Sequence, residues 1–169
     1  MRWLITVAGT VIACVAGLAG IGYSTHNTHV VQVRIDLSAS PDTVARLLAD
    51  LDGWADWNHS IDAIEALDER PEIRDVDGDL GFLRLGPDPQ APEGSVTYRL
   101  ERRWYSGKWS FDVEQLDGGS RVTFTEQARI ENLVIRGLTV VRNQSNDLAA
   151  FLTGLAGHFG EEAAPQSLS

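Results

Sequence analysis

The sequence predicts an α+β fold, with an antiparallel sheet of about six to seven strands, a long C-terminal helix on one face of it, and one transmembrane helix before it. Residues 3–23 contain 21 positions without a charge. Several segments between residues 31 and 130 alternate apolar and polar residues, as half-buried strands do. From Leu138 to Phe159, apolar residues recur at spacings of three and four, which is typical of one helix face. Strands joined by tight turns pair antiparallel and need one covering layer.

The uncharged segment 3–23 is predicted to span a membrane. As a helix it would be about 31 Å long, close to the hydrocarbon core of about 30 Å. Trp3 and Tyr23 lie at its ends, where aromatic rings favour the headgroup boundary. Arg2 precedes the segment and no Lys or Arg follows before Arg34, so the positive-inside rule predicts a cytoplasmic N-terminus and an extracytoplasmic domain.

Two alternatives to an uncleaved anchor stay open. A signal peptide cleaved after the small-x-small sequence Gly17-Leu18-Ala19 would leave a secreted domain. The sequence Val11-Ile12-Ala13-Cys14 is similar to a degenerate bacterial lipobox, in which Cys14 would carry a lipid. The apolar run continues well past Cys14, which favours a role for this cysteine as a small apolar residue.

The composition limits the classes of function. The chain has 24 acidic and 14 basic residues and a formal net charge of −10, which argues against a nucleic-acid partner because such partners require a basic surface. The single cysteine excludes a disulfide framework and Cys-rich metal sites. The sequence has no Gly-rich phosphate loop, no His-Glu-x-x-His and no Gly-x-Ser-x-Gly, so we expect no metal and no cofactor.

The elements of the domain follow from alternation, turn residues and capping residues. Ser40 and Pro41 begin a short helix with an apolar face, and a second short helix or turn covers residues 53–58. Strands are predicted at residues 31–37, 61–67, 73–76, 80–85, 96–104, 108–116 and 121–130, with turns at Asp77-Gly78, Ser106-Gly107 and residues 117–120. One continuous helix of about 22 residues closes the domain. The predicted boundaries are an anchor at 1–23, a linker at 24–29, a domain at 30–160 and a disordered tail at 161–169.

This order of elements and six short motifs resemble the START-like, Bet v 1-like (SRPBCC) helix-grip superfamily, and within it the bacterial polyketide cyclase/dehydrase and lipid-transport branch. The motifs are Ile35–Pro41, Leu47–Asp50, Trp54–Asn58, Gly107–Phe111, Gly119–Glu126 and Phe151–Gly160. The resemblance covers residues 30–160 and implies a helix-grip fold that holds a hydrophobic ligand between sheet and long helix. The family often has Asn-Pro where this chain has Asn132-Leu133, so the turn into the last helix is expected to differ.

Glu126 is the candidate for chemistry, either as a ligand contact or as a catalytic acid or base. Alternation places it on the apolar face of its strand with Phe124, where a carboxylate is costly unless it is paired, hydrogen-bonded or protonated. Arg102 lies among apolar residues of the strand 96–104. We expect both side chains to point into the cavity, where they form an ion pair or present a polar spot to a ligand. The alternatives are a purely structural ion pair, or strand bulges that turn either residue to solvent.

The remaining candidates are apolar or weakly polar. They extend the proposed ligand-binding set to Tyr98, Arg102, Trp104, Trp109, Phe111, Phe124, Glu126, Val141, Ser145 and Leu148. Aromatic residues on an inner face are more often core than pocket, and in a cavity-forming fold they can serve as both. Ser145 interrupts the apolar stripe of the long helix, where its hydroxyl is expected to bond the backbone.

The histidines and the acidic turn at residues 75–79 are not expected to bind metal. His59 lies near Asp56 and Asp62 in the sequence but has no second histidine nearby, and His158 is expected on a distant helix end. The acidic turn begins like a calcium loop and then lacks the required Gly and Glu.

The sequence therefore favours a membrane-anchored, extracytoplasmic protein that holds a hydrophobic small molecule or lipid. One alternative is a cyclase or dehydratase-like enzyme in which Glu126, with Arg102 or Tyr98, performs acid–base work. A second is a protein-interaction module with a collapsed cavity. The oligomeric state and the identity of the ligand are left open by the sequence.

Overall fold

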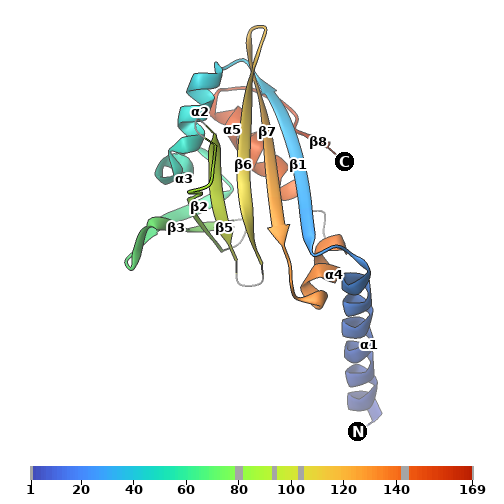
Figure 1. Cartoon of the computed structure of the whole chain (residues 1–169). Coiled ribbons are helices and arrows are strands. Elements are labelled where there is room, and N and C mark those ends of the chain that lie inside the picture. The colour runs from blue at the N-terminus through green and yellow to red at the C-terminus, as the bar shows by residue number, and fades with distance from the viewer. Residues whose placement is uncertain (1, 79–81, 93–94, 103–104, 142–144, 169) are drawn as a thin grey trace.

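The computed structural model describes residues 2–78, 82–92, 95–102, 105–141 and 145–168 (Figure 1). Its helices are α1 (Arg2–Ser24), α2 (Pro41–Ala49), the 3-10 turn η1 (Leu51–Gly53), α3 (Trp54–Trp57), α4 (Leu133–Val141) and α5 (Ser145–His158). Its strands are β1 (Thr28–Leu37), β2 (Ile61–Leu67), β3 (Arg70–Gly78), β4 (Leu83–Pro87), β5 (Val96–Glu101), β6 (Ser106–Leu116), β7 (Gly119–Arg129) and β8 (Gln166–Leu168).

The described strands form one antiparallel sheet in the order β2-β3-β4-β5-β6-β7-β1-β8. The predicted antiparallel α+β architecture is confirmed. The three longest strands are neighbours: β6 pairs with β7 and β7 with β1 along their whole lengths. Their shared register fixes which side chains face each other on the inner side of the sheet.

The helices α2, α3 and α5 cover one face of the sheet (Figure 1). Helix α2 packs on β5, β6 and β7, whereas α5 packs on β1 and contacts α3. Pro41 lies in the first turn of α2, where its fixed φ and missing N–H are tolerated. The apolar residues Val44 and Leu48 of this helix are buried against the sheet, as their spacing predicts.

The core is an aromatic cluster centred on Phe151 of α5. The centroid of its ring lies 5.0 Å from that of Trp54, 5.6 Å from that of Phe111 and 5.3 Å from that of Phe124. All four side chains are buried. Because they come from α3, β6, β7 and α5, their packing joins both helical segments to the centre of the sheet.

The prediction of one continuous C-terminal helix over residues 138–159 is wrong. The region forms two helices. Helix α4 ends at Val141, and helix α5 begins at Ser145. The first helix begins earlier than predicted because Asn132 caps it. The Asn132 Oδ1 accepts hydrogen bonds from the backbone N–H groups of Val134 and Ile135 at 3.0 and 3.1 Å. This cap stands where the family often has Asn-Pro.

The boundaries of the β5–β6 turn also differ from the prediction. Strand β5 ends at Glu101 and β6 begins at Ser106. Ser106 and Gly107 pair with Glu101 and Leu100 within the ladder, so they are strand residues and not the predicted hairpin turn. The predicted strand 96–104 is correspondingly too long.

The C-terminal tail is ordered where disorder was predicted. Residues 166–168 form β8, which pairs with β1 at the sheet edge. The Glu161 carboxylate also accepts hydrogen bonds from the backbone N–H and the hydroxyl of Ser38. These backbone and side-chain partners explain why a small, polar segment keeps a defined path.

The first helix, α1, covers the predicted anchor and extends away from the sheet (Figure 1). Only residues 25–27 separate it from β1, so the predicted linker 24–29 is shorter than expected. Among the residues that the structure describes, no helix has both the length and the apolar character needed to cross a membrane.

Replacing Phe151 by Ala should lower the free energy of unfolding by about 3–5 kcal/mol, because it opens a cavity where four elements meet. Phe82, which is exposed, is the matched control, and its replacement by Ala should cost less than about 1 kcal/mol. Urea denaturation followed by circular dichroism measures both values. Similar losses for the two variants would contradict a core centred on Phe151.

Candidate functional site

A buried carboxylate lies on the inner face of β7. Glu126 is 4% exposed, and Phe124 and Ala128 beside it are fully buried. Trp109, its partner across the β6–β7 ladder, donates its indole N–H to Oε2 of Glu126 over 2.8 Å. The Tyr105 hydroxyl donates to Oε1 over 3.4 Å. No cation among the described residues forms an ion pair with Glu126, so neutral donors satisfy it.

Tyr105 lies between Glu126 and Arg102. The Arg102 Cζ lies 5.4 Å from the centroid of the Tyr105 ring, within the range of a cation–π interaction. The Arg102 backbone N–H donates to the Tyr105 carbonyl over 2.9 Å, so Arg102 belongs to the β5–β6 turn and not to a strand as predicted. Tyr105 thus takes the place of the predicted ion pair between Glu126 and Arg102.

One donor in this group is unsatisfied. The Nε of Arg102 is buried and has no hydrogen-bond partner within the described part of the chain. Leaving such a donor unpaired costs free energy. Together, Arg102, Tyr105 and Glu126 present donor and acceptor groups beside the aromatic core, at the end of the sheet where β5 ends and β6 begins (Figure 1).

The pKa of Tyr105 is raised. Burial is the main cause, and the Glu126 carboxylate raises the pKa further, whereas the Arg102 guanidinium lowers it. The phenol therefore stays protonated and remains a donor to Glu126 over the whole neutral range.

Tyr98 is bonded elsewhere. Its hydroxyl donates to the carbonyl of Leu48 over 2.8 Å, and the Trp54 indole N–H donates to the same carbonyl over 3.2 Å. This carbonyl belongs to the last turn of α2, where helical partners are lacking. Burial raises the pKa of Tyr98, and the charges of Asp50 and Asp52 add to the effect. Tyr98 therefore fixes α2 on the sheet.

The other aromatic candidates are part of the core. Trp109, Phe111 and Phe124 are each at most 3% exposed. Phe111 and Phe124 stack with their ring centroids 4.4 Å apart, and Trp109 meets Phe124 edge to face at 5.1 Å. Whether a ligand also contacts these rings stays a prediction.

Three of the last four candidates lie in the C-terminal helices. Leu148 of α5 is buried, and Ser145 is half-buried as the first residue of that helix. Val141 ends α4, and its side chain lies outside what the structure describes. Trp104 lies outside the described residues.

The sequence reasoning missed Tyr105, although a signal for it exists. Tyr105 directly precedes β6, and the two-residue period places it in line with residues 107, 109 and 111 on one face of that strand, the face on which the alternation predicts Trp109 and Phe111. The prediction took Ser106-Gly107 as a turn, which interrupted the pattern before it reached Tyr105.

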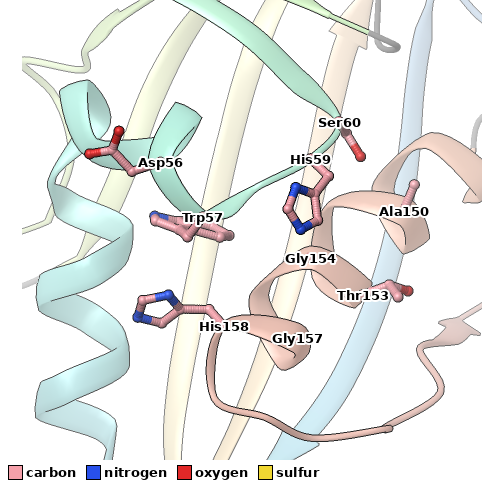
Figure 2. Close-up of a pocket in the computed structure, with 9 residues that line it drawn as sticks. All are labelled: Asp56, Trp57, His59, Ser60, Ala150, Thr153, Gly154, Gly157 and His158. Atoms are coloured by element: carbon pink, nitrogen blue, oxygen red, sulfur yellow. The ribbon is translucent and has the colours of Figure 1, made fainter.

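A second feature is a surface pocket of about 620 Å³ between α3, the following loop and α5 (Figure 2). Its lining residues are Asp56, Trp57, His59, Ser60, Ala150, Thr153, Gly154, Gly157 and His158. The expectation that His158 lies far from His59 is wrong, because both line this pocket. The ring centroids of His158 and Trp57 are 6.0 Å apart.

This pocket lacks the features of a metal centre. Figure 2 shows the carboxylate of Asp56 pointing away from both imidazoles. Within the described ranges, no group of three or more His, Cys, Asp and Glu residues could hold a metal ion. Asn58, between the lining residues Trp57 and His59, is buried, and its Nδ2 donates to the Phe151 carbonyl over 3.2 Å.

Comparison with known proteins identifies one family. Residues 28–160, well over half of the chain, match the model of the family described as "Polyketide cyclase / dehydrase and lipid transport". No curated protein sequence matches the chain.

Solved structures share the fold at low sequence identity. A START superfamily protein from Mycobacterium smegmatis is 14% identical, with a TM-score of 0.56, and the match covers 76% of this chain and 95% of that one. An aromatase/cyclase from Streptomyces sp. R1128 is 18% identical, with a TM-score of 0.56 and coverages of 77% and 92%. Ginseng major latex-like protein 151 from Panax ginseng is 13% identical, with a TM-score of 0.59 and coverages of 79% and 96%.

The raised pKa of Tyr105 gives a testable pH dependence. Because the folded state disfavours the phenolate, the stabilisation is complete below about pH 10, the ordinary value for tyrosine, and is lost as the pH rises above it. Replacing Tyr105 by Phe should reduce the slope of unfolding free energy against pH in this range by up to about 1.4 kcal/mol per pH unit. Urea denaturation at a series of pH values from about 9 to about 11.5, around the reference pKa of about 10, measures the slope of the unfolding free energy against pH. Equal slopes for both proteins would contradict the buried position of this phenol.

Proposed function

Because the chain belongs to the polyketide cyclase / dehydrase and lipid transport family, we propose that it binds a hydrophobic small molecule or lipid between its sheet and α5. A curved antiparallel sheet with a helix across one face suits an elongated apolar ligand. The START-like fold supports this class of function but does not specify the ligand.

The observation that carries the proposal is the polar group beside the aromatic core. Glu126 is a buried acceptor held by the neutral donors Trp109 and Tyr105, and the buried Nε of Arg102, beside Tyr105, has no hydrogen-bond partner among the residues that the structure describes. A hydroxyl or amide of an otherwise apolar molecule can accept from Arg102 and donate to Glu126. Such a ligand would satisfy the free donor and keep its apolar part against the core.

Although no helix among the described residues has the length and apolar character of a membrane span, we propose further, from the sequence of residues 3–23, that this segment anchors the chain in a membrane with the domain on the extracytoplasmic side. The support is the run of 21 uncharged positions with Trp3 and Tyr23 at its ends. Val11, Val15 and Ile21 of α1 are exposed, which suits contact with lipid. The alternative is a secreted domain released by cleavage near Ala19.

Replacing Glu126 by Gln should weaken ligand retention at least about tenfold, or about 1.4 kcal/mol. The protein is purified in mild detergent, extracted with organic solvent and analysed by mass spectrometry for a co-purifying apolar molecule. Glu114, which is exposed on β6, is the matched control, and its replacement by Gln should leave the amount of ligand unchanged.

Three outcomes distinguish the possible functions. Equal ligand in the wild type and the Glu126→Gln variant, with unchanged stability, would rule out a ligand contact at Glu126. A wild-type domain that carries no apolar molecule would favour the protein-interaction alternative. Turnover of a polyketide-like substrate that is lost in the Glu126→Gln variant would instead indicate an enzyme.

The anchoring proposal predicts that the full chain stays with the membrane fraction after alkaline extraction, because an inserted helix does not depend on surface charge. A chain in which Val11 and Val15 are both replaced by Arg should be released, since each arginine near the centre of a membrane helix costs about 2.5–3.5 kcal/mol. Recovery of the wild type in the soluble fraction, with residues 1–19 missing by mass spectrometry, would support the cleaved signal peptide.

A further inference from the structure

Helix α1 is fixed to the domain through backbone contacts. It ends at Ser24, and three residues later β1 begins at Thr28. The Asn27 carbonyl accepts a hydrogen bond from the Ile130 backbone N–H over 2.8 Å, which holds the connecting residues against the end of β7. The direction of α1 is therefore set by the domain.

Helix α4 packs directly against the last turns of α1 (Figure 1). The backbones touch at two glycines: a Cβ on Gly22 would collide with the Leu133 carbonyl oxygen, and a Cβ on Gly137 would collide with the Leu18 carbonyl oxygen. Small residues allow this close approach of two helices, as they do in membrane helix pairs.

Arg136, the single charged residue of α4, contributes hydrogen bonds to the α1–α4 contact. The guanidinium of Arg136 donates through Nη1 to the carbonyls of Gly22 and Thr25, at 3.2 and 3.3 Å. Its Nη2 donates to the Ile130 carbonyl over 2.7 Å. Arg136 therefore donates hydrogen bonds to carbonyls at the C-terminus of α1 and just after β7. Its positive charge lies next to these backbone oxygens.

An apolar surface results at this junction. The side chains of Ile21 and Leu133 are 40% and 39% exposed, and that of Tyr23 is 81% exposed. Helix α4 has the sequence LVIRGLTVV, which contains no acidic residue, in a chain whose formal net charge is −10. The absence of acid from this helix suits contact with a lipid surface.

The position of α4 along α1 indicates how far α4 would lie below the membrane surface. The uncharged run of α1 ends at Tyr23, which marks the headgroup boundary if the run crosses the bilayer. At the two glycine contacts, α4 lies against Leu18 and Gly22 of α1, and Leu18 is five residues, or about 8 Å, below Tyr23. Helices that lie in the membrane interface bury their apolar face by about 5–10 Å, which is the same depth.

We propose that α4 lies in the interface of the bilayer, alongside the end of α1, and that it presents the Glu126 end of the domain to the lipid surface. This inference rests on the anchoring part of the proposed function. Glu126 lies seven residues before Leu133, on the strand that leads directly into α4. An apolar ligand would then pass between the bilayer and the domain without crossing water.

The test uses Cys14, the only cysteine of the chain, as a starting point for site-specific labels. The wild type carries an NBD fluorophore at Cys14. Three further full-length proteins contain Cys14→Ser and one new cysteine each, at Leu133, at exposed Glu131 just before α4, or at exposed Asp117 in the β6–β7 turn at the far end of the sheet (Figure 1). All are reconstituted into phosphatidylcholine vesicles with lipids spin-labelled either near the headgroup or deep in the acyl chain.

We expect the labels at positions 133 and 131 to be quenched at least about twofold more strongly by the shallow spin label than by the deep one, as for a helix in the interface. The label at Cys14, near the centre of the run, should show the reverse preference, and the label at position 117 should not be quenched. The position 131 label keeps the test decisive if Leu133→Cys disturbs the α1–α4 contact.

The outcomes separate this inference from the anchoring proposal. Deep quenching at Cys14 without quenching at positions 133 and 131 would overturn the inference and leave the anchor intact. Absence of quenching at Cys14 would refute the anchor, and with it the membrane position of α4. Equal quenching at positions 117 and 133 would show that the domain lies flat on the bilayer, which also overturns the proposed orientation.

Discussion

The packing of Phe151 between two helical segments and the sheet is the contact on which the rest of the domain depends. Its ring meets Trp54 and Trp57 of α3 on one side and Trp109, Phe111 and Phe124 of the sheet on the other. Edge-to-face and offset contacts of this kind add to the burial of large apolar areas. Since α5 packs on the sheet mainly along β1, this cluster is what ties it to the central strands and to α3.

The aromatic cluster also determines where polar chemistry can occur. Rings fill the inner face at the level of Phe124, so the polar partners that the proposed ligand would require lie beyond them, at the end of the sheet where Tyr105 and Glu126 lie. The same rings exclude water from the Glu126 carboxylate, and its hydrogen bond from Trp109 becomes stronger in a surrounding of low dielectric constant. The core and the candidate site are thus parts of one packing arrangement.

The sequence predicted the sheet and the position of Glu126 well, because alternation reports directly which face of a strand is buried. It failed where one local signal overrode a longer pattern. Ser106-Gly107 has the composition of a turn, but its residues are paired in the ladder, and this hid Tyr105. The helical stripe from Leu138 to Phe159 predicted one helix, whereas Asn132 starts an earlier helix and α5 begins separately at Ser145. Edge pairing of β8 depends on long-range contacts that no local pattern encodes.

Two arginines near the same end of the domain illustrate how structural and binding roles can be separated. Arg136 directs its guanidinium to the backbone carbonyls of Gly22 in α1 and of Ile130, directly after β7, so the fold itself supplies its acceptors. Arg102 contacts the Tyr105 ring but leaves its buried Nε unpaired in the described part of the chain. A buried donor without an acceptor lowers the stability of the folded state, because no hydrogen bond compensates for its loss of contact with water. The position of Arg102 beside Tyr105, the donor to Glu126, is physically reasonable if a ligand supplies the acceptor, and for this reason the proposed binding site includes Arg102 and not Arg136.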